Sequence, residues 1–151
     1  MTILVINSIV YKMDKHLTKN QIIHIWIFTS LLVTWVDIYI DEKKLGYWYF
    51  DKGIGWRNFL VYTILIPPVS VLILNCFPFN DSLLKKLKYL VFWIIFMLFY
   101  ESIALLPQPW GFFHYGWWKF WYSIIEDPFL LLILFAFYKW IFRIEKINYE
   151  N

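Results

Sequence analysis

Cysteine, charge and known catalytic motifs are all scarce in this chain of 151 residues. Its single cysteine, Cys76, cannot form an internal disulfide, and charged residues make up 17 % of the chain against about 25 % in soluble domains. The net charge of +3 is small and scattered along the chain. Together these values exclude a disulfide-stapled secreted domain, a disordered chain, a collagen-like fibre and a nucleic-acid-binding arm.

The sequence also lacks the short motifs that hold common cofactors, metals and nucleophiles. It contains no dinucleotide-binding GxGxxG, no phosphate-binding loop, no CxxC, no HExxH and no GxSxG. We therefore expect no bound cofactor, no metal site and no nucleic-acid partner.

Apolar and aromatic residues are abundant instead. They account for 61 % and 24 % of the chain, with 10 Trp, 11 Tyr and 15 Phe, whereas soluble domains average about 45–50 % apolar residues. One small core cannot bury this much apolar surface, so the composition indicates that a lipid bilayer is part of the solvent.

Four segments are long and apolar enough to cross a bilayer as helices, which takes about 20 residues each. A helix is the open-chain structure that satisfies its own backbone hydrogen bonds in lipid. The predicted fold is an all-α integral membrane protein, an antiparallel bundle of four transmembrane helices with aromatic-rich outer loops. The predicted spans are residues 21–40, 58–79, 89–106 and 122–142, within one membrane domain of residues 21–151.

A leader of residues 1–20 precedes the first span. Its apolar stretch, residues 2–11, is too short to cross a bilayer, so the leader is expected to be cytoplasmic or to lie at the membrane interface. Met13 opens a hydrophilic stretch just before the first span and is an alternative start of translation.

The placement of positive charge predicts the orientation. Nine Lys and Arg residues flank the spans on the side of the two termini, and five lie on the other side. The positive-inside rule therefore favours a plasma-membrane protein with both termini in the cytoplasm. The outer connections, residues 41–56 and 107–122, are rich in Trp and Tyr, which prefer the headgroup level of the membrane.

Glu101 is the acid that most needs an explanation, because a charged group in lipid is costly. It lies about 18 Å along the third span, close to mid-bilayer, and no Lys or Arg shares that span. The pair Pro67–Pro68 lies at a similar depth and frees the carbonyls of Thr63 and Ile64 one turn back. We expect a protonated Glu101 to donate to this backbone, either as a structural bond or as part of a proton or cation site.

Three further residues are candidates for a site. Asp37 lies near the outer end of the first span, where it can reach headgroup water or pair with a lysine of the following loop. Glu126 opens the fourth span, and Asp127 is expected to cap that helix with Pro128 in its first turn. His114 is the histidine of the outer loops and can titrate near neutral pH.

Three stretches carry a resemblance to a known group of proteins. They are WVDIYID at 35–41 with YWYF at 47–50, YE at 100–101, and HYGWWKFWYS at 114–123 with YKWI at 138–141. Together they resemble a family of small, uncharacterised multi-spanning membrane proteins of Bacillus- and Clostridium-type bacteria, which implies a membrane location and no particular activity. A further stretch, IIEDPF at 124–129, is similar to the acidic signature of small membrane-bound carotenoid cyclases, without its leading proline.

Three classes of function remain open. The first is a non-catalytic accessory or envelope protein that binds a membrane protein partner or forms a homo-oligomer. The second is a membrane-embedded enzyme that acts on a lipid or isoprenoid through its acids, and the third is an oligomeric carrier coupled to protons or cations. The enzyme requires Asp37, Glu101 and Glu126 to meet in one cavity, the carrier requires a polar path through mid-bilayer, and the accessory role lets the acids lie apart.

Overall fold

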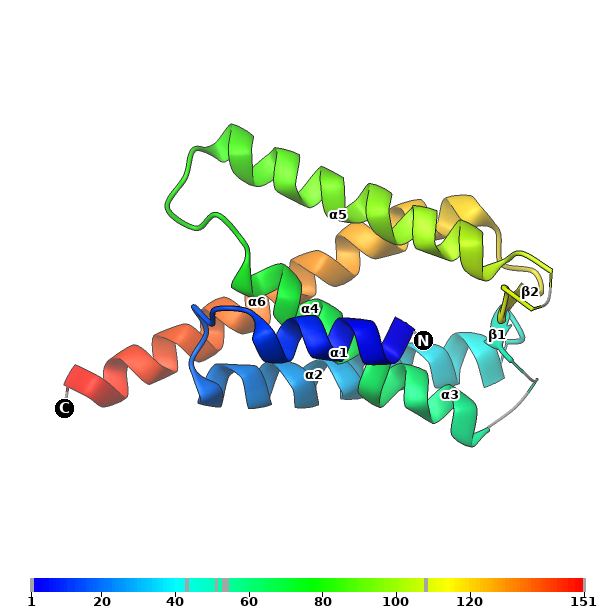
Figure 1. Cartoon of the computed structure of the whole chain (residues 1–151), viewed down its shortest axis with the longest axis horizontal. Coiled ribbons are helices and arrows are strands. Elements are labelled where there is room, and N and C mark those ends of the chain that lie inside the picture. Colours follow the sequence, from blue (N-terminus) through cyan, green and yellow to red (C-terminus); the bar gives the residue numbers. More distant parts are fainter. Residues whose placement is uncertain (1, 43, 51, 53–54, 108, 151) are drawn as a thin grey trace.

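A computed structural model describes residues 2–42, 44–50, 52, 55–107 and 109–150 of the chain. These residues form helices and one two-stranded ribbon (Figure 1). The elements in chain order are α1 Thr2–Lys12, α2 Lys19–Asp37, the π-helical turn η1 Ile38–Glu42, β1 Tyr47–Tyr49, α3 Trp56–Leu60, the π-helical turn η2 Val61–Leu65, α4 Ile66–Asn75, α5 Leu83–Ala104, β2 Phe113–Tyr115 and α6 Phe120–Glu150.

Four helical segments are long and apolar enough to cross a bilayer. They are Lys19–Ile40, Trp56–Asn75, Leu83–Ala104 and Phe120–Ile147. The predicted fold class is confirmed: the chain is an all-helical, multi-pass membrane protein. The third span begins six residues before the predicted start at residue 89, because the basic turn that precedes that residue is already part of α5.

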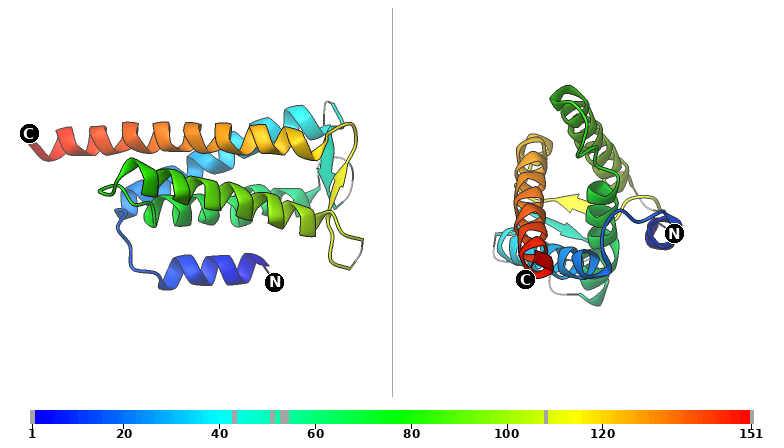
Figure 2. Two further views of the ribbon diagram at one scale, coloured as in Figure 1. Left: turned by 90° about the horizontal axis from the view of Figure 1, so that it is seen from above. Right: turned by 90° about the vertical axis from the view of Figure 1, so that its left-hand side faces the viewer.

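The connections between the spans gather at two ends of the molecule (Figures 1 and 2). We call the end with strands β1 and β2 the sheet end, and the end with the C-terminus the terminal end. The leader's apolar stretch is the helix α1, which packs against η2 and α4 at the side of the bundle (Figure 2). It is shorter than the spans and accompanies the second span over only part of its length.

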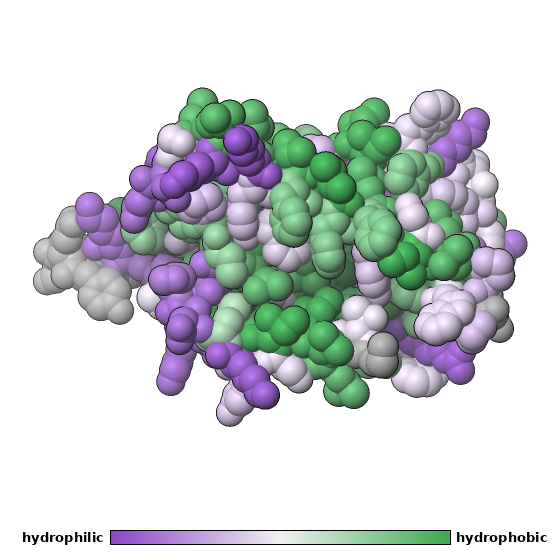
Figure 3. Space-filling model, turned by 45° about the horizontal axis from the view of Figure 1, so that its top comes forward, coloured by the Kyte–Doolittle hydropathy of each residue, from purple (hydrophilic) through white to green (hydrophobic). Residues whose placement is uncertain are grey.

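Most side chains of the spans face outward rather than into the protein. In the most apolar stretch of the second span, Trp56–Asn75, 61 % of the residues are buried. The corresponding share in the other three spans is between 11 % and 17 %. The second span is therefore the central helix. A broad apolar band lies between two more hydrophilic ends on the face shown in Figure 3. Soluble monomers rarely expose so much continuous apolar surface, so this band is the lipid-facing girdle.

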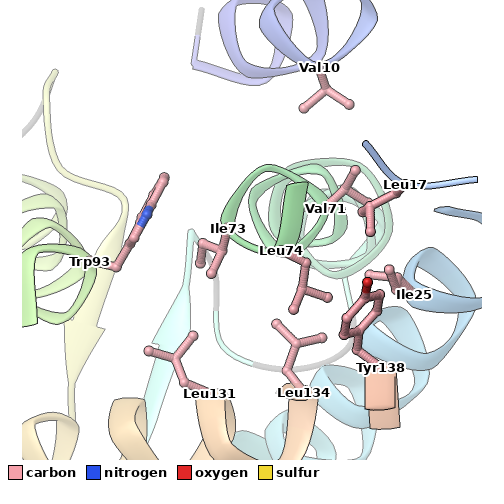
Figure 4. Close-up of a cluster of buried hydrophobic side chains, with 10 residues drawn as sticks. All are labelled: Val10, Leu17, Ile25, Val71, Ile73, Leu74, Trp93, Leu131, Leu134 and Tyr138. Carbon is pink, nitrogen blue, oxygen red and sulfur yellow. The ribbon is translucent and has the colours of Figure 1, made fainter. Parts of the chain in front are cut away.

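The largest buried cluster surrounds α4 on its terminal-end side. Figure 4 shows side chains from α1, α2, α5 and α6 converging on this helix. Val71, Ile73 and Leu74 of α4 are at most 2 % exposed. Because lipid tails are as apolar as these side chains, close packing rather than removal from water stabilises the cluster.

Asn75, the last residue of α4, holds the leader against the bundle. It is 4 % exposed, and its Oδ1 accepts hydrogen bonds from the backbone N–H groups of His16 at 2.8 Å and Leu17 at 3.2 Å. Its Nδ2 donates to the carbonyl of Asp14 at 2.9 Å. These three bonds fix the segment between α1 and α2, so α1 returns along the central span.

The central span is interrupted at the pair Pro67–Pro68, which lies in the first turn of α4, directly after η2. A proline has no N–H, so the carbonyls of Thr63 and Ile64 lose their partners one turn back. The indole N–H of Trp26 on α2 donates to the carbonyl of Thr63 at 2.9 Å. The Nδ2 of Asn7 on α1 donates to the carbonyl of Ile64 at 3.0 Å. Two neighbouring helices thus replace the bonds that the prolines remove.

The hypothesis that Glu101 donates to this freed backbone is therefore wrong. Glu101 lies in the last turn of α5, at the sheet end, and its Oε1 accepts hydrogen bonds from Tyr115 and Ser123. The donors for the central span come from α1 and α2, because these are the helices that pack beside η2.

α6 is one continuous helix of 31 residues with Pro128 in its interior. The prediction that Asp127 caps this helix is wrong, because α6 begins two turns earlier, at Phe120. The fixed φ of proline is compatible with a helix, and ending the helix there would leave more backbone groups unpaired in lipid than the one bond that Pro128 removes. Asp127 lies two turns after the start of α6 and therefore does not cap this helix.

We expect Trp26→Phe to lower the free energy of unfolding by about 1–3 kcal/mol, because it leaves the carbonyl of Thr63 without its donor. In a Pro67→Ala background the cost is smaller, since residue 67 then supplies an N–H one turn away. Unfolding in detergent micelles measures both losses, and Trp140→Phe, at an exposed position, is the control. Equal losses in the two backgrounds would show that the indole does not replace the proline's missing bond.

Candidate functional site

A two-stranded antiparallel ribbon joins the two aromatic loops at the sheet end (Figure 1). Side chains alternate between the two faces of a strand. Tyr47, Tyr49 and Phe113 line a cavity inside the bundle. Trp48 and His114, which come between them, stack on each other with ring centroids 5.9 Å apart. The ribbon thus presents one face to the cavity and a separate face away from it.

Gly116 allows the two loops to close on each other. Its backbone N–H donates to the carbonyl of Gly46 at 2.7 Å, and a Cβ atom at Gly116 would lie 2.1 Å from the carbonyl oxygen of Leu45. Any larger residue at this position would force the loops apart. The indole N–H of Trp117 adds a bond to the carbonyl of Lys44 at 2.7 Å. The two loops are therefore hydrogen-bonded to each other and together cover the sheet end of the bundle.

Beneath the ribbon lies a cavity of about 490 Å³. Its walls come from α1, α2, η2, α4, α5 and α6, and most of the side chains that line it are aliphatic or aromatic. Small-molecule sites have volumes of about 300–1,000 Å³ and are mostly apolar with a few placed polar groups. The cavity therefore has the size and composition of a ligand site.

Glu101 is held in the cavity wall by a chain of hydrogen bonds. The hydroxyls of Tyr115 and Ser123 both donate to its Oε1, the latter at 2.7 Å. The indole N–H of Trp118 donates to the Oγ of Ser123 at 3.1 Å. Two donors on one oxygen fix the orientation of this carboxyl group and come from two segments that follow α5 in the chain.

Asp37, the last residue of α2, also lines the cavity. The expectation that it reaches headgroup water is wrong, because Asp37 is 2 % exposed. The alternative, a pair with Lys43 or Lys44, stays a prediction, since Lys43 lies outside the described residues. The hydroxyl of Tyr47 on β1 donates to its Oδ1. The π-helical turn η1 follows Asp37 directly, and η2 borders the cavity on the central span. Such turns occur frequently at functional sites.

Glu126 and Asp127 of α6 complete the acidic set. Both line the same cavity and are half-buried. The Oδ2 of Asp127 is buried and has no hydrogen-bond partner in the part of the chain that the structure describes. Four carboxyl groups from α2, α5 and α6 therefore meet in one apolar cavity.

The acids lie at a common depth. Asp37 ends α2, Glu101 lies three residues before the end of α5, and Glu126 lies six residues after the start of α6. Each is therefore within about 10 Å of the sheet end of its helix. Glu101 is closer to the end of its helix than the expected span of residues 89–106 implied, because α5 both starts and ends earlier.

His114, the remaining candidate, is not brought to the acids. It lies on the other face of the ribbon against Trp48 and does not line the cavity. Within the described ranges, no group of three or more His, Cys, Asp or Glu side chains is arranged to hold a metal ion. Carboxyl and hydroxyl groups are prominent among the polar groups that line the cavity.

The tyrosines of the ribbon have raised pKa values. Burial is the largest cause for Tyr47 and Tyr49, and the negative charge of Asp37 raises the pKa of both further. Burial and the hydrogen bond to Glu101 raise the pKa of Tyr115. All three side chains are therefore neutral at physiological pH, and Tyr47 and Tyr115 keep the protons that they donate to the acids.

Sequence reasoning missed the residues that hold the acids in place. Tyr47, Tyr115 and Ser123 were visible only as part of a general aromatic and polar loop composition. One signal was present: the runs YWY at 47–49 and FHY at 113–115 are rich in aromatic residues, which are enriched in strands. Nothing local indicates that these two patterns pair with each other.

No protein family model, no curated protein and no solved structure matches this chain. The fold defines its class, a multi-pass membrane protein with four candidate spans. The function must therefore be argued from the site itself.

Tyr47→Phe removes a donor from the buried Asp37, so we expect it to lower the free energy of unfolding by about 1.5–3 kcal/mol at neutral pH. Above about pH 10, tyrosine ionises in the unfolded chain while the buried Tyr47 does not, so the wild-type protein loses stability as the pH rises. The variant loses less over the same interval, because one perturbed tyrosine is missing. Unfolding in detergent at neutral and alkaline pH measures both effects.

The control for this prediction is Tyr11→Phe, which changes an exposed tyrosine in the same way. It is expected to match the wild-type protein at both pH values. A Tyr47→Phe protein as stable as wild type at neutral pH would contradict a structural role for this hydroxyl.

Proposed function

We propose that this membrane protein is an enzyme that acts on a lipid or isoprenoid chain by acid–base chemistry. The observation that carries the proposal is the meeting of Asp37, Glu101 and Glu126, from three different spans, in one apolar cavity. An enzyme of this kind requires such an arrangement, whereas an accessory protein does not. A carrier requires a polar path, but the deepest part of the cavity is lined by Ile73 and Leu134 of the buried apolar cluster.

The dimensions of the cavity support a chain-like substrate. On α6 its lining extends from Ser123 to Leu134, which corresponds to about 17 Å along the helix. This is close to half of the roughly 30 Å hydrocarbon core of a bilayer, the depth that the chains of one leaflet occupy. A chain that enters with its reacting end at the acids therefore has room for its apolar remainder.

Glu101 and Glu126 are the proposed proton donor and acceptor. Because two donors already occupy Oε1 of Glu101, the proton of its neutral form sits on Oε2, from which it can pass to a double bond of the chain. The resulting carbocation then loses a proton from a neighbouring carbon to Glu126. The double bond has moved, and the two carboxyl groups together hold as many protons as before.

The surroundings suit such an intermediate. Asp37, oriented by Tyr47, places a further carboxyl group at the same end of the cavity. The rings of Tyr47 and Trp118 lie 5.4 Å apart in the cavity wall, and ring faces attract cations. Fixed charges and rings in a water-poor site stabilise a developing positive charge more than they would in water.

The test is a change in lipid composition that depends on Glu101. Wild-type, Glu101→Gln and Asp81→Asn proteins are expressed to equal levels in a bacterial membrane, and lipid extracts are compared by chromatography and mass spectrometry. We expect an isomerised lipid in the wild-type extract and roughly a hundredfold less of it with Glu101→Gln, because the general acid is lost.

The variant and its control are matched. Glu101→Gln keeps an oxygen that accepts from Tyr115 and Ser123 but has no acidic proton, so the fold is retained. Asp81→Asn makes the same chemical change at an exposed carboxylate that pairs with Lys85 at 2.8 Å, outside the cavity. Identical lipid extracts from all three proteins would overturn the catalytic role.

We also propose that the sheet end faces outward and that the terminal end, which carries the C-terminus and the start of α2, is cytoplasmic, while α1 lies along the central span. The excess of Lys and Arg on the side of the termini supports this orientation. The motif resemblance supports a place for the protein in the plasma membrane of Bacillus- or Clostridium-type bacteria, among their small multi-spanning proteins.

A further inference from the structure

We infer that the acidic end of the cavity binds a positive charge, so that the ligand is a single-chain amphiphile with a cationic head or reacting centre and not a phosphate-bearing lipid. The inference rests on the proposed function, because it names the substrate class of the same site. It concerns what the site selects, whereas the proposed function concerns what the site does to the ligand.

The charge at this end of the cavity has one sign. Asp37, Glu101, Glu126 and Asp127 line it, and the described residues that line it include no Lys, Arg or His. A phosphate group beside these carboxyl groups is repelled, whereas a cation is attracted. The lipids that surround the protein mostly carry phosphate, so this repulsion keeps bulk lipid out of the site.

Thr29 is an independent sign that the cavity holds a ligand. It lines the cavity and is 4 % exposed, and its Oγ1 is buried with no hydrogen-bond partner among the residues described. A buried hydroxyl without a partner is costly unless a bound molecule pairs with it. Thr29 lies eight residues before Asp37 on α2, about 12 Å deeper. Among the described residues, the cavity thus has a buried hydroxyl without a hydrogen-bond partner well below the acids.

Aromatic rings surround the acidic end in a way that suits a cation. Tyr47, Phe113 and Trp118 all line the cavity, and the ring centroid of Tyr47 lies 5.1 Å from that of Phe113 and 5.4 Å from that of Trp118. Ring faces attract cations most strongly where water is excluded. An ammonium group interacts favourably with both the rings and the carboxylates, whereas a neutral hydroxyl head interacts mainly with the carboxylates.

The test compares three single-chain probes of equal length: dodecyltrimethylammonium, dodecanol and dodecyl phosphate. Their binding to the full-length protein is measured in phosphatidylcholine nanodiscs, and protein-free nanodiscs measure partition into lipid. We expect the ammonium probe to bind at least about tenfold more tightly than either of the others. Equal or tighter binding of dodecanol or dodecyl phosphate overturns the inference.

Carboxyl variants show whether the preference comes from this site. Glu126→Gln and Asp127→Asn are each expected to weaken binding of the ammonium probe about tenfold and to leave dodecanol binding unchanged. Asp81→Asn, outside the cavity, keeps the wild-type preference. Asp127→Asn decides the matter if Glu126→Gln does not fold. A preference that survives the loss of these carboxyl groups overturns the inference.

The two proposals fail in different ways. Probe binding is measured without turnover, and lipid extracts report turnover without a probe. A Glu101-dependent change in lipids without a preference for the ammonium probe removes this inference alone. A preference for the ammonium probe without any change in lipids removes the catalytic proposal and leaves a cation-binding site.

Discussion

Lipid offers no hydrogen bonds, and the pair Pro67–Pro68 leaves two backbone carbonyls of the central span without partners at a depth where water cannot replace them. The fold depends on how these carbonyls are satisfied. The indole of Trp26 on α2 donates a hydrogen bond to one of them, and the side-chain amide of Asn7 on α1 donates to the other. Both helices also form walls of the cavity. The bonds that complete the backbone therefore also position the walls of the site.

At the sheet end, too, polar groups in apolar surroundings receive hydrogen bonds from other segments. The hydroxyl of Tyr47 donates to Asp37, and the hydroxyls of Tyr115 and Ser123 donate to Glu101. These hydroxyl donors carry no charge of their own and fix the orientation of the carboxyl oxygens that accept from them. The contact between the two loops thus also positions the acids in the cavity wall.

The position of the acids connects the fold to the proposed function. Ends of three helices meet under the ribbon, and an apolar chamber extends from them towards the middle of the membrane. A chain-like ligand therefore places its polar or reacting end among the acids and its remainder among aliphatic side chains. The separation of a polar end from an apolar chamber arises because each of the three helices carries its acids close to its sheet end.

The sequence by itself determined the solvent, the number of spans and the acids worth attention. Hydropathy is a local property, and an acid such as Glu101 stands out in an apolar run without knowledge of its neighbours. Tertiary structure decided the start of α5, the continuation of α6 through Pro128, and every partner of the site. Trp26 and Thr63 are 37 residues apart, and Asn7 and Ile64 are 57 apart. Many distant donors are chemically able to serve a given acceptor, and only the packing of the helices in three dimensions selects the one that reaches it.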